Sequence, residues 1–222
     1  LSLPGAVQKA WLRDFANGLA RDQKEFQIAL LGGDTGRTPG PLCIAVTALG
    51  YVSQGRMIRR RGARIGDGVF VTGPIGDSGG GLAVLKGEGA HLPAAARAEL
   101  IGRYRLPRPR LDMDLDGVAS AALDISDGLI ADLEHIADAS QVKLTIKAER
   151  IPRSGALRAL WGDEAPAILR AVGAGDDYDI AFTAAGAPPG CTQIGTVTPG
   201  HGVALVMGGE IMTVSSPGYR HF

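Results

Sequence analysis

The sequence predicts an α/β fold divided into two lobes, and three observations lead to this prediction. Short apolar runs typical of strands alternate along the chain with amphipathic stretches at helical spacing. The 222 residues are 45% hydrophobic and 21% charged, a globular composition with enough length to bury a sizeable core. Between about Val52 and Gly68 the composition changes to arginine and glycine, which indicates a crossover between lobes of residues 1–55 and 56–222.

The charge balance excludes several classes of partner. Lysine plus arginine and aspartate plus glutamate are equal at 23 each, so no long-range field would recruit nucleic acid or an acidic membrane. We therefore expect a small-molecule partner. Glycine is the outlier at 33 residues, about twice its usual share of roughly 7%, and it indicates close backbone approach in several loops.

Cysteine usage and hydropathy indicate a reducing compartment. Cys43 and Cys191 show neither metal-ligand spacing nor a disulfide framework. No apolar run approaches the roughly 20 residues of a membrane span, and the start of the chain lacks a basic-then-apolar signal pattern. We expect a cytoplasmic protein with no membrane partner.

The first lobe is predicted to contain one helix and two strands. Residues 1–4 resemble the end of a strand and not a native start, so we expect a segment to precede them. Apolar residues at helical spacing predict an amphipathic helix over residues 6–20. Strands are predicted over residues 28–31 and 42–51, where apolar and β-branched residues dominate.

A tight turn, Gly32-Gly33-Asp34-Thr35, follows the first of these strands. As structure alone, its glycines allow positive φ and its aspartate caps neighbouring backbone groups. As chemistry, it places a carboxylate at a strand end where a phosphate can come close. Asp34 is therefore a candidate ligand for Mg²⁺.

The crossover is rich in arginine, at positions 56, 59, 60, 61 and 64. Such a cluster is either a solvated surface or a site where one planar guanidinium holds a phosphate chain. Beyond it we predict a strand over residues 69–72 and a glycine loop over residues 73–82 that leads into a helix through Leu85. Two further helices are predicted over residues 93–104 and 111–120. The glycine loop is neither a Walker A sequence nor a GxGxxG dinucleotide loop. An extended Leu-Pro-Arg-Pro-Arg linker separates the last two helices.

The second lobe is organised around the stretch Ala-Ala-Leu-Asp-Ile-Ser-Asp-Gly-Leu, which begins at Ala121. This pattern predicts a buried strand, a turn, and a helix from Leu129, with Asp124, Ser126 and Asp127 at the turn. Carboxylates at such a turn suit a phosphate only through a hard cation such as Mg²⁺. The alternative is purely structural, with Ser126 as the helix N-cap and Asp127 complementing the helix dipole.

The rest of the chain alternates strands with one helix. We predict strands over residues 142–146, 193–198, 203–207 and 210–214, and a helix over residues 166–172. The glycine turn Gly-Ala-Gly-Asp-Asp-Tyr-Asp feeds another strand and carries three acids, Asp176, Asp177 and Asp179. A turn-forming, solvated role accounts for one or two of them.

Seven motifs occur in one order: Gly-Gly-Asp-Thr, Arg-Arg-Gly-Ala, Val-Thr-Gly-Pro-Ile-Gly-Asp-Ser, Leu-Pro-Arg-Pro-Arg, Leu-Asp-Ile-Ser-Asp-Gly-Leu, Gly-Asp-Asp-Tyr-Asp and the terminal Gly-Tyr-Arg-His-Phe. This series resembles the thiamine-monophosphate kinase family. That family lies in a superfamily with aminoimidazole ribonucleotide synthetase, selenophosphate synthetase and a hydrogenase maturation factor. The resemblance covers essentially the whole chain.

The resemblance implies direct transfer of the γ-phosphoryl group of ATP to thiamine monophosphate, assisted by several Mg²⁺ ions. It also implies a homodimer in which two ferredoxin-like first lobes form a barrel, beside an α/β second lobe. The family has an N-terminal segment with an Asp-Asp-Ala motif that this sequence lacks. The first lobe is therefore expected to be partial.

The resemblance also implies roles for individual residues. The nucleotide would contact Gly33, Asp34, Arg60 and Ser126. The magnesium ligands would be Asp34, Asp124 and Asp127. The substrate would face Asp176, where the family usually has the longer glutamate, and Tyr219, the nearest aromatic candidate for packing on the substrate; Ser216 stands where a larger ring is expected.

Two alternatives remain open. The first is another ATP-using member of the same superfamily, acting on a purine precursor or on a selenium or carbamoyl donor. The second, from a different class, is a nucleotide-binding fragment that cannot assemble the complete metal site.

Overall fold

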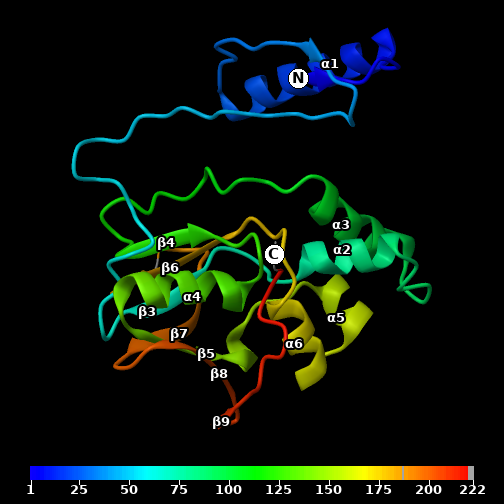
Figure 1. Cartoon of the computed structure of the whole chain (residues 1–222). Coiled ribbons are helices and arrows are strands. Elements are labelled where there is room, and N and C mark those ends of the chain that lie inside the picture. The colour runs from blue at the N-terminus through cyan, green and yellow to red at the C-terminus, as the bar shows by residue number, and fades with distance from the viewer. Residues whose placement is uncertain (187, 220–222) are drawn as a thin grey trace. The chain divides into compact units, whose positions relative to one another are not determined.

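The computed structural model describes residues 1–186 and 188–219, which form two compact units, residues 1–52 and the described residues from 53 onward (Figure 1). The Arg-His-Phe end of the last motif, residues 220–222, lies outside the described residues. Among the described residues, none of the helices has both the length and the apolar character that crossing a bilayer requires.

The first unit contains one long helix and two very short strands. β1 (Ser2–Leu3) pairs in parallel with β2 (Gly36–Arg37), and α1 spans Lys9–Phe26 between them. On α1 the rings of Trp11 and Phe15 stack with centroids 5.3 Å apart. The predicted helix is confirmed, and it extends further than its apolar spacing indicated.

The two strands predicted in the first unit do not form, and that prediction was wrong. Residues 28–31 and 42–51 have no regular structure apart from a bridge between Ser2 and Cys43. Their apolar side chains are exposed, for example 81% at Val46 and 80% at Leu49. A strand needs a neighbour that accepts and donates its backbone hydrogen bonds, and the described part of this unit pairs neither segment into a ladder.

The second unit is built on a seven-stranded sheet with the order β4-β6-β3-β7-β5-β8-β9. All its neighbouring strands are antiparallel except β5 and β8. The strands are β3 (Gly68–Val71), β4 (Ala121–Asp124), β5 (Lys143–Lys147), β6 (Ile180–Ala184), β7 (Thr192–Thr198), β8 (Gly202–Met207) and β9 (Glu210–Ile211).

Helix α4 (Leu129–Ser140) lies across one face of this sheet (Figure 1). Leu129, Leu133 and Ile136 of α4 are fully buried with Leu144 and Ile146 of β5 in the main core. Burying side chains of this size stabilises the unit by roughly 1.5–3 kcal/mol each. The predicted α4 is therefore confirmed, and its apolar stripe is the contact with the sheet.

The remaining helices gather beside one end of the sheet, as Figure 1 shows. They are α2 (Asp77–Leu85), α3 (Ala94–Arg105), α5 (Gly155–Trp161) and α6 (Ala165–Val172), with a 3₁₀ turn at Ala148–Arg150. A second apolar cluster joins them through Leu100, Leu157 and Ala171. This arrangement leaves the start of α2 and the end of α6 close to the sheet end that carries the β4 turn.

Two local predictions in the second unit were wrong. Residues 111–120 form turns and no helix, because Gly117 has φ 72° and the Asp114 side chain accepts the backbone N–H of Asp116. Short acids that bond their own backbone compete with helix formation. Helix α5 was not predicted, although Ser154 caps it by accepting the backbone N–H of Leu157.

Candidate functional site

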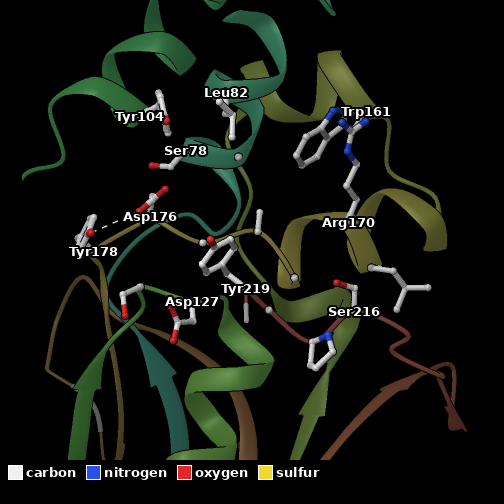
Figure 2. A pocket seen from close by; sticks show the side chains of 18 of the residues that line it. Ser78, Leu82, Tyr104, Asp127, Trp161, Arg170, Asp176, Tyr178, Ser216 and Tyr219 are labelled. Carbon is white, nitrogen blue, oxygen red and sulfur yellow. Dashed lines mark hydrogen bonds between the residues drawn. The ribbon is translucent and has the colours of Figure 1, made fainter. Parts of the chain in front are cut away.

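A cavity of about 1070 Å³ lies in the second unit where four segments meet (Figure 2). The segments are the turn after β4, the start of α2, the loop between α6 and β6, and the chain at residues 215–219. Side chains from helices α3, α5 and α6 complete its wall. The labelled lining residues in Figure 2 are Ser78, Leu82, Tyr104, Asp127, Trp161, Arg170, Asp176, Tyr178, Ser216 and Tyr219.

Asp132 organises the turn after β4. Its Oδ2 atom accepts backbone N–H groups of Ser126, Asp127 and Gly128 at 2.9, 3.0 and 3.1 Å. The side chain is buried, and this burial raises the pKa of its carboxyl despite the three donors. The sequence indicates only a minor role for Asp132, because this residue lies inside the predicted helix.

The purely structural interpretation of the turn is also corrected. The N-cap of α4 is Gly128, with φ 133° and no side-chain cap, so Ser126 is not the N-cap. Asp132 reaches back from inside the helix and accepts the backbone N–H groups of the turn. The side chains of Ser126 and Asp127 are consequently left to line the cavity.

Backbone hydrogen bonds tie the loop before β6 to this turn. The N–H of Asp176 donates to the Ser126 carbonyl and that of Tyr178 to the Ile125 carbonyl, both at 2.8 Å. The N–H of Ile125 returns a bond to the Asp179 carbonyl, also at 2.8 Å. Asp176 and Tyr178 both hold positive φ, 66° and 53°, which is uncommon outside glycine.

The segment at residues 215–219 closes the site through two further backbone bonds. Tyr219 donates its N–H to the Asp127 carbonyl at 2.8 Å, and Ala131 donates to the Pro217 carbonyl at 3.1 Å. Gly218 lies so close that an added Cβ would stand 2.6 Å from the same Asp127 oxygen. Gly175 is as constrained, because its Cβ would overlap the Ser126 carbonyl oxygen.

Asp177 is a buried structural acid and not a solvated turn residue. It is 1% exposed and accepts the N–H groups of Gly76 at 2.6 Å and Ser78 at 3.2 Å, which holds the start of α2. Burial raises the pKa of its carboxyl to about 7.

Asp179 is buried as well, at 2% exposed, and it joins two arginines. It accepts Thr72 Oγ1 at 2.9 Å, Arg103 at 2.8 Å and Arg110 at 3.2 Å. Arg110 belongs to the Leu-Pro-Arg-Pro-Arg motif, which is therefore structural at this position. Two of the three acids in the Gly-Asp-Asp-Tyr-Asp motif, Asp177 and Asp179, are therefore buried and not solvated.

The structure brings together four of the residues singled out in the sequence. Ser126, Asp127, Asp176 and Tyr219 all line the cavity. Asp124 is exposed at the end of β4 and is not among the lining residues. Asp124 nevertheless interacts electrostatically with a residue that lines the cavity, Tyr178. Burial and the charges of Asp176, Asp124 and Asp127 raise the pKa of Tyr178.

The other predicted site residues lie elsewhere. Arg60 is exposed in the segment before β3 and does not line the cavity. Gly33 and Asp34 are exposed in the first unit, where Asp34 Oδ1 accepts the N–H of Thr35 at 2.8 Å.

The acids of the site suit a magnesium ion that is shared with a phosphate. Within the described ranges, no group of three or more histidine, cysteine, aspartate or glutamate side chains forms a protein-only metal cage. Mg²⁺ usually keeps several waters and takes one or two carboxylates together with phosphate oxygens. Asp124 and Asp127 supply that kind of hard oxygen donor, so the donor set fits the ion.

Sequence reasoning missed the opposite wall of the cavity. The Arg170 guanidinium lies 4.2 Å above the centre of the Trp161 ring and pairs with both carboxylate oxygens of Glu88, at 2.6 and 3.0 Å. Trp161 belongs to α5, which was not predicted, and Arg170 belongs to α6. The cavity thus has an acidic side, which suits a phosphate only together with a bound cation, and another side formed by Trp161 and Arg170.

Comparison with known proteins defines the class of the fold. Residues 1–52 match the family model of the AIR synthase related protein, N-terminal domain, and residues 64–208 match that of its C-terminal domain. A solved structure of Escherichia coli HypE, a hydrogenase maturation protein, shares the fold at TM-score 0.68 with 19% identity, over 98% of this chain and 72% of that one.

More similar relatives are thiamine-monophosphate kinases. The chain is 39% identical to that of Caulobacter vibrioides over 98% of its own length and 66% of the relative. It is 36% identical to that of Escherichia coli K12 over 100% of its length and 72% of the relative. The chain belongs to the thiamine-monophosphate kinase family, and it spans about two thirds of the length of these relatives.

Two solved structures extend the comparison. The thiamine-monophosphate kinase of Stenotrophomonas maltophilia K279a matches with TM-score 0.80 and 34% identity, over 96% of this chain and 71% of that one. AaThiL complexed with AMPPCP and TMP matches with TM-score 0.81 and 30% identity, over 100% of this chain and 71% of that one.

Proposed function

We propose that the protein transfers the γ-phosphoryl group of ATP to thiamine monophosphate, giving thiamine diphosphate and ADP. The observation that carries this proposal is the convergence of Ser126, Asp127, Asp176 and Tyr219 on one cavity. The family membership supports it, as does a similar structure that holds AMPPCP, an analogue of ATP, together with TMP.

The proposed roles follow the chemistry of the two sides of the site. In the second unit Asp124 and Asp127 would hold Mg²⁺, which offsets phosphate charge when it is bound. In the first unit Asp34 is the proposed magnesium ligand. Ser126, Gly33 and Arg60 are the proposed nucleotide contacts. Asp176 and Tyr219 would face thiamine monophosphate. Positioning and charge neutralisation are the main tasks of the protein in phosphoryl transfer.

We also propose that the protein acts as a cytoplasmic homodimer. The support is the exposed apolar surface of the first unit, where the largest exposed side chains of residues 42–52 are Leu42, Ile44, Val46, Leu49, Tyr51 and Val52. An apolar patch of this kind is a typical interaction site, and open backbone groups beside it can pair with another chain. Light scattering on the purified protein measures its molar mass, and a monomer would contradict this part.

Release of ADP with thiamine monophosphate as acceptor tests the activity. We expect turnover that needs both ATP and thiamine monophosphate and that yields thiamine diphosphate. Unphosphorylated thiamine is the matched control, because it keeps the ring system and lacks the acceptor phosphate. An ADP release rate that does not depend on thiamine monophosphate would contradict the proposal. It would favour another ATP-using member of the superfamily.

A second candidate is a nucleotide-binding protein with an incomplete metal site. It is favoured by one observation, that Asp124 is exposed at the end of β4 and does not line the cavity together with Asp127. The same assay decides between the two. Binding of ATP without any turnover of thiamine monophosphate would favour this second candidate.

A further inference from the structure

Tyr178 occupies a place in the cavity that the proposed roles leave unused. It lies in the loop that leads into β6, and its side chain stands beside Asp176 (Figure 2). The residue is 39% exposed and lines the cavity, so its side chain is only partly packed. The motif Gly-Asp-Asp-Tyr-Asp predicts roles for its acids, and its tyrosine has no role assigned from the sequence.

The backbone of Tyr178 is held in a conformation that an aromatic residue rarely adopts. Its φ is 53°, and its N–H is fixed to the Ile125 carbonyl at 2.8 Å. Asp176, two residues earlier, has φ 66° and is fixed in the same way to Ser126. Unfavourable backbone conformations persist where the surroundings determine them, and they concentrate at functional sites. Here the strain aims two side chains into one cavity.

The surroundings of the phenol make it a hydrogen-bond donor. A phenol carries its proton at neutral pH, and burial and the charges of Asp176, Asp124 and Asp127 raise the pKa of Tyr178 further. Its acceptor is Asp176 Oδ1 at 3.4 Å, which is long for a bond between two oxygen atoms. The phenol O–H can therefore donate a hydrogen bond to a ligand oxygen that lies closer than Asp176 Oδ1 does.

The acidic side of the cavity needs such donors. Arg170 is the only cationic side chain among the described lining residues, and it is already paired with Glu88. A phosphate beside Asp127 and Asp176 must then be bound by a metal ion, backbone N–H groups or neutral hydroxyls. Tyr178 offers such a hydroxyl, because it lines the cavity and its phenol lies 3.4 Å from Asp176 Oδ1.

We propose that Tyr178 contacts the acceptor substrate, with its phenol donating a hydrogen bond to a phosphate oxygen of thiamine monophosphate. This inference rests on the proposed function, because the acceptor phosphate is the ligand it names. It assigns Tyr178 a specificity role beside Asp176: the phenol recognises the phosphate that thiamine itself lacks.

The test compares Tyr178→Phe with Tyr104→Phe, since each removes one hydroxyl from the same cavity and keeps the ring. Calorimetry measures the affinity of each variant for thiamine monophosphate and for AMPPCP, and turnover is measured separately. We expect Tyr178→Phe to weaken thiamine monophosphate about tenfold or more, because a hydrogen bond to a charged group is lost. AMPPCP affinity and the unfolding temperature should stay at the wild-type values. Tyr104→Phe should lose less affinity.

The outcomes separate this inference from the proposed function. An unchanged affinity of Tyr178→Phe for thiamine monophosphate overturns the inference even if the wild type turns over. An equal loss for both ligands also overturns it, since the effect would then be a general change of the cavity. If the wild type binds thiamine monophosphate without turnover and Tyr178→Phe weakens that binding, the contact stands and the proposed reaction does not. Absence of wild-type binding overturns both.

Discussion

Asp132 Oδ2 lies 3.0 Å from the backbone nitrogen of Asp127, and it accepts the neighbouring N–H groups of Ser126 and Gly128 as well. One buried carboxylate oxygen thus fixes three successive peptide units. These units carry two of the residues that we propose for nucleotide and metal binding. The geometry of the site therefore depends on a residue that does not line the cavity.

The first prediction concerns this anchor. Asp132→Ala should lower the free energy of unfolding by about 2–4 kcal/mol, because it leaves buried N–H donors without an acceptor. Asp138→Ala is the matched control, since Asp138 is exposed on the same helix and should change the free energy by no more than about 0.5 kcal/mol. Urea unfolding of both variants measures the difference. Equal effects would show that the three hydrogen bonds contribute little.

The second prediction concerns pH. The pKa of Asp177 is raised by burial from 3.8 to about 7 in the folded protein, so the folded state binds this proton more tightly than the unfolded state. Stability from this group is then full below pH 4 and falls as the pH rises to 7, by at most about 1.4 kcal/mol per pH unit.

Asp177→Asn isolates that contribution, because asparagine does not titrate. The unfolding free energy of the wild type minus that of Asp177→Asn should decrease between pH 4 and pH 7 and then level off. Urea unfolding at a series of pH values measures it. A difference that is constant or rises with pH would contradict the raised pKa of Asp177.

The third prediction uses two glycines that differ in their surroundings. Gly175→Ala should destabilise the protein and weaken ligand binding, because the new Cβ would overlap the Ser126 carbonyl at the edge of the cavity. Gly102→Ala should instead stabilise it by about 0.4–1 kcal/mol, since α3 has nothing within 4 Å of that Cβ and the unfolded chain loses freedom. Thermal unfolding compares the two. Similar shifts for both would contradict the close approach at Gly175.

The fourth prediction concerns the arginine-rich crossover. Arg60→Ala should weaken ATP about tenfold or more, if its guanidinium holds a phosphate by charge-assisted hydrogen bonds. Arg56→Ala should do much less, because Arg56 already pairs with Asp116 at 2.8 Å on the exposed surface. Calorimetric titration with ATP measures both. If the two variants bind ATP alike, the cluster is a solvated surface.

Periodicity predicted helices α2, α3, α4 and α6 and most strands of the second unit, because packing there agrees with the local pattern. Helix α4 is the clearest case, with its apolar stripe fully buried against β5. The same kind of apolar content failed at residues 42–51, where the described chain offers no partner strand. A strand is a property of two segments, and a local pattern reports only one of them.

The site shows a similar division. Ser126, Asp127 and Asp176 could be recognised from their motifs, since turns beside glycines and strand ends carry a local signature. Nothing local indicated that Asp177 is buried, or that Arg170 faces the same cavity, because both depend on contacts between distant segments. Long-range packing decides such placements.

The fifth prediction is that nucleotide binding depends on Mg²⁺. Asp124 and Asp127 stand on the acidic side of the site, and a polyphosphate brought near them without a cation meets repulsion of about 1 kcal/mol per charge pair even in water. ATP affinity measured by calorimetry should therefore fall about tenfold or more when EDTA replaces Mg²⁺. Asp127→Asn should reduce this dependence on the metal, because one anionic ligand is lost. Asp138→Asn, on the exposed face of α4, should keep the wild-type dependence. ATP binding with equal affinity in EDTA and in Mg²⁺ would rule out the shared ion, and the two aspartates would then have no metal to hold.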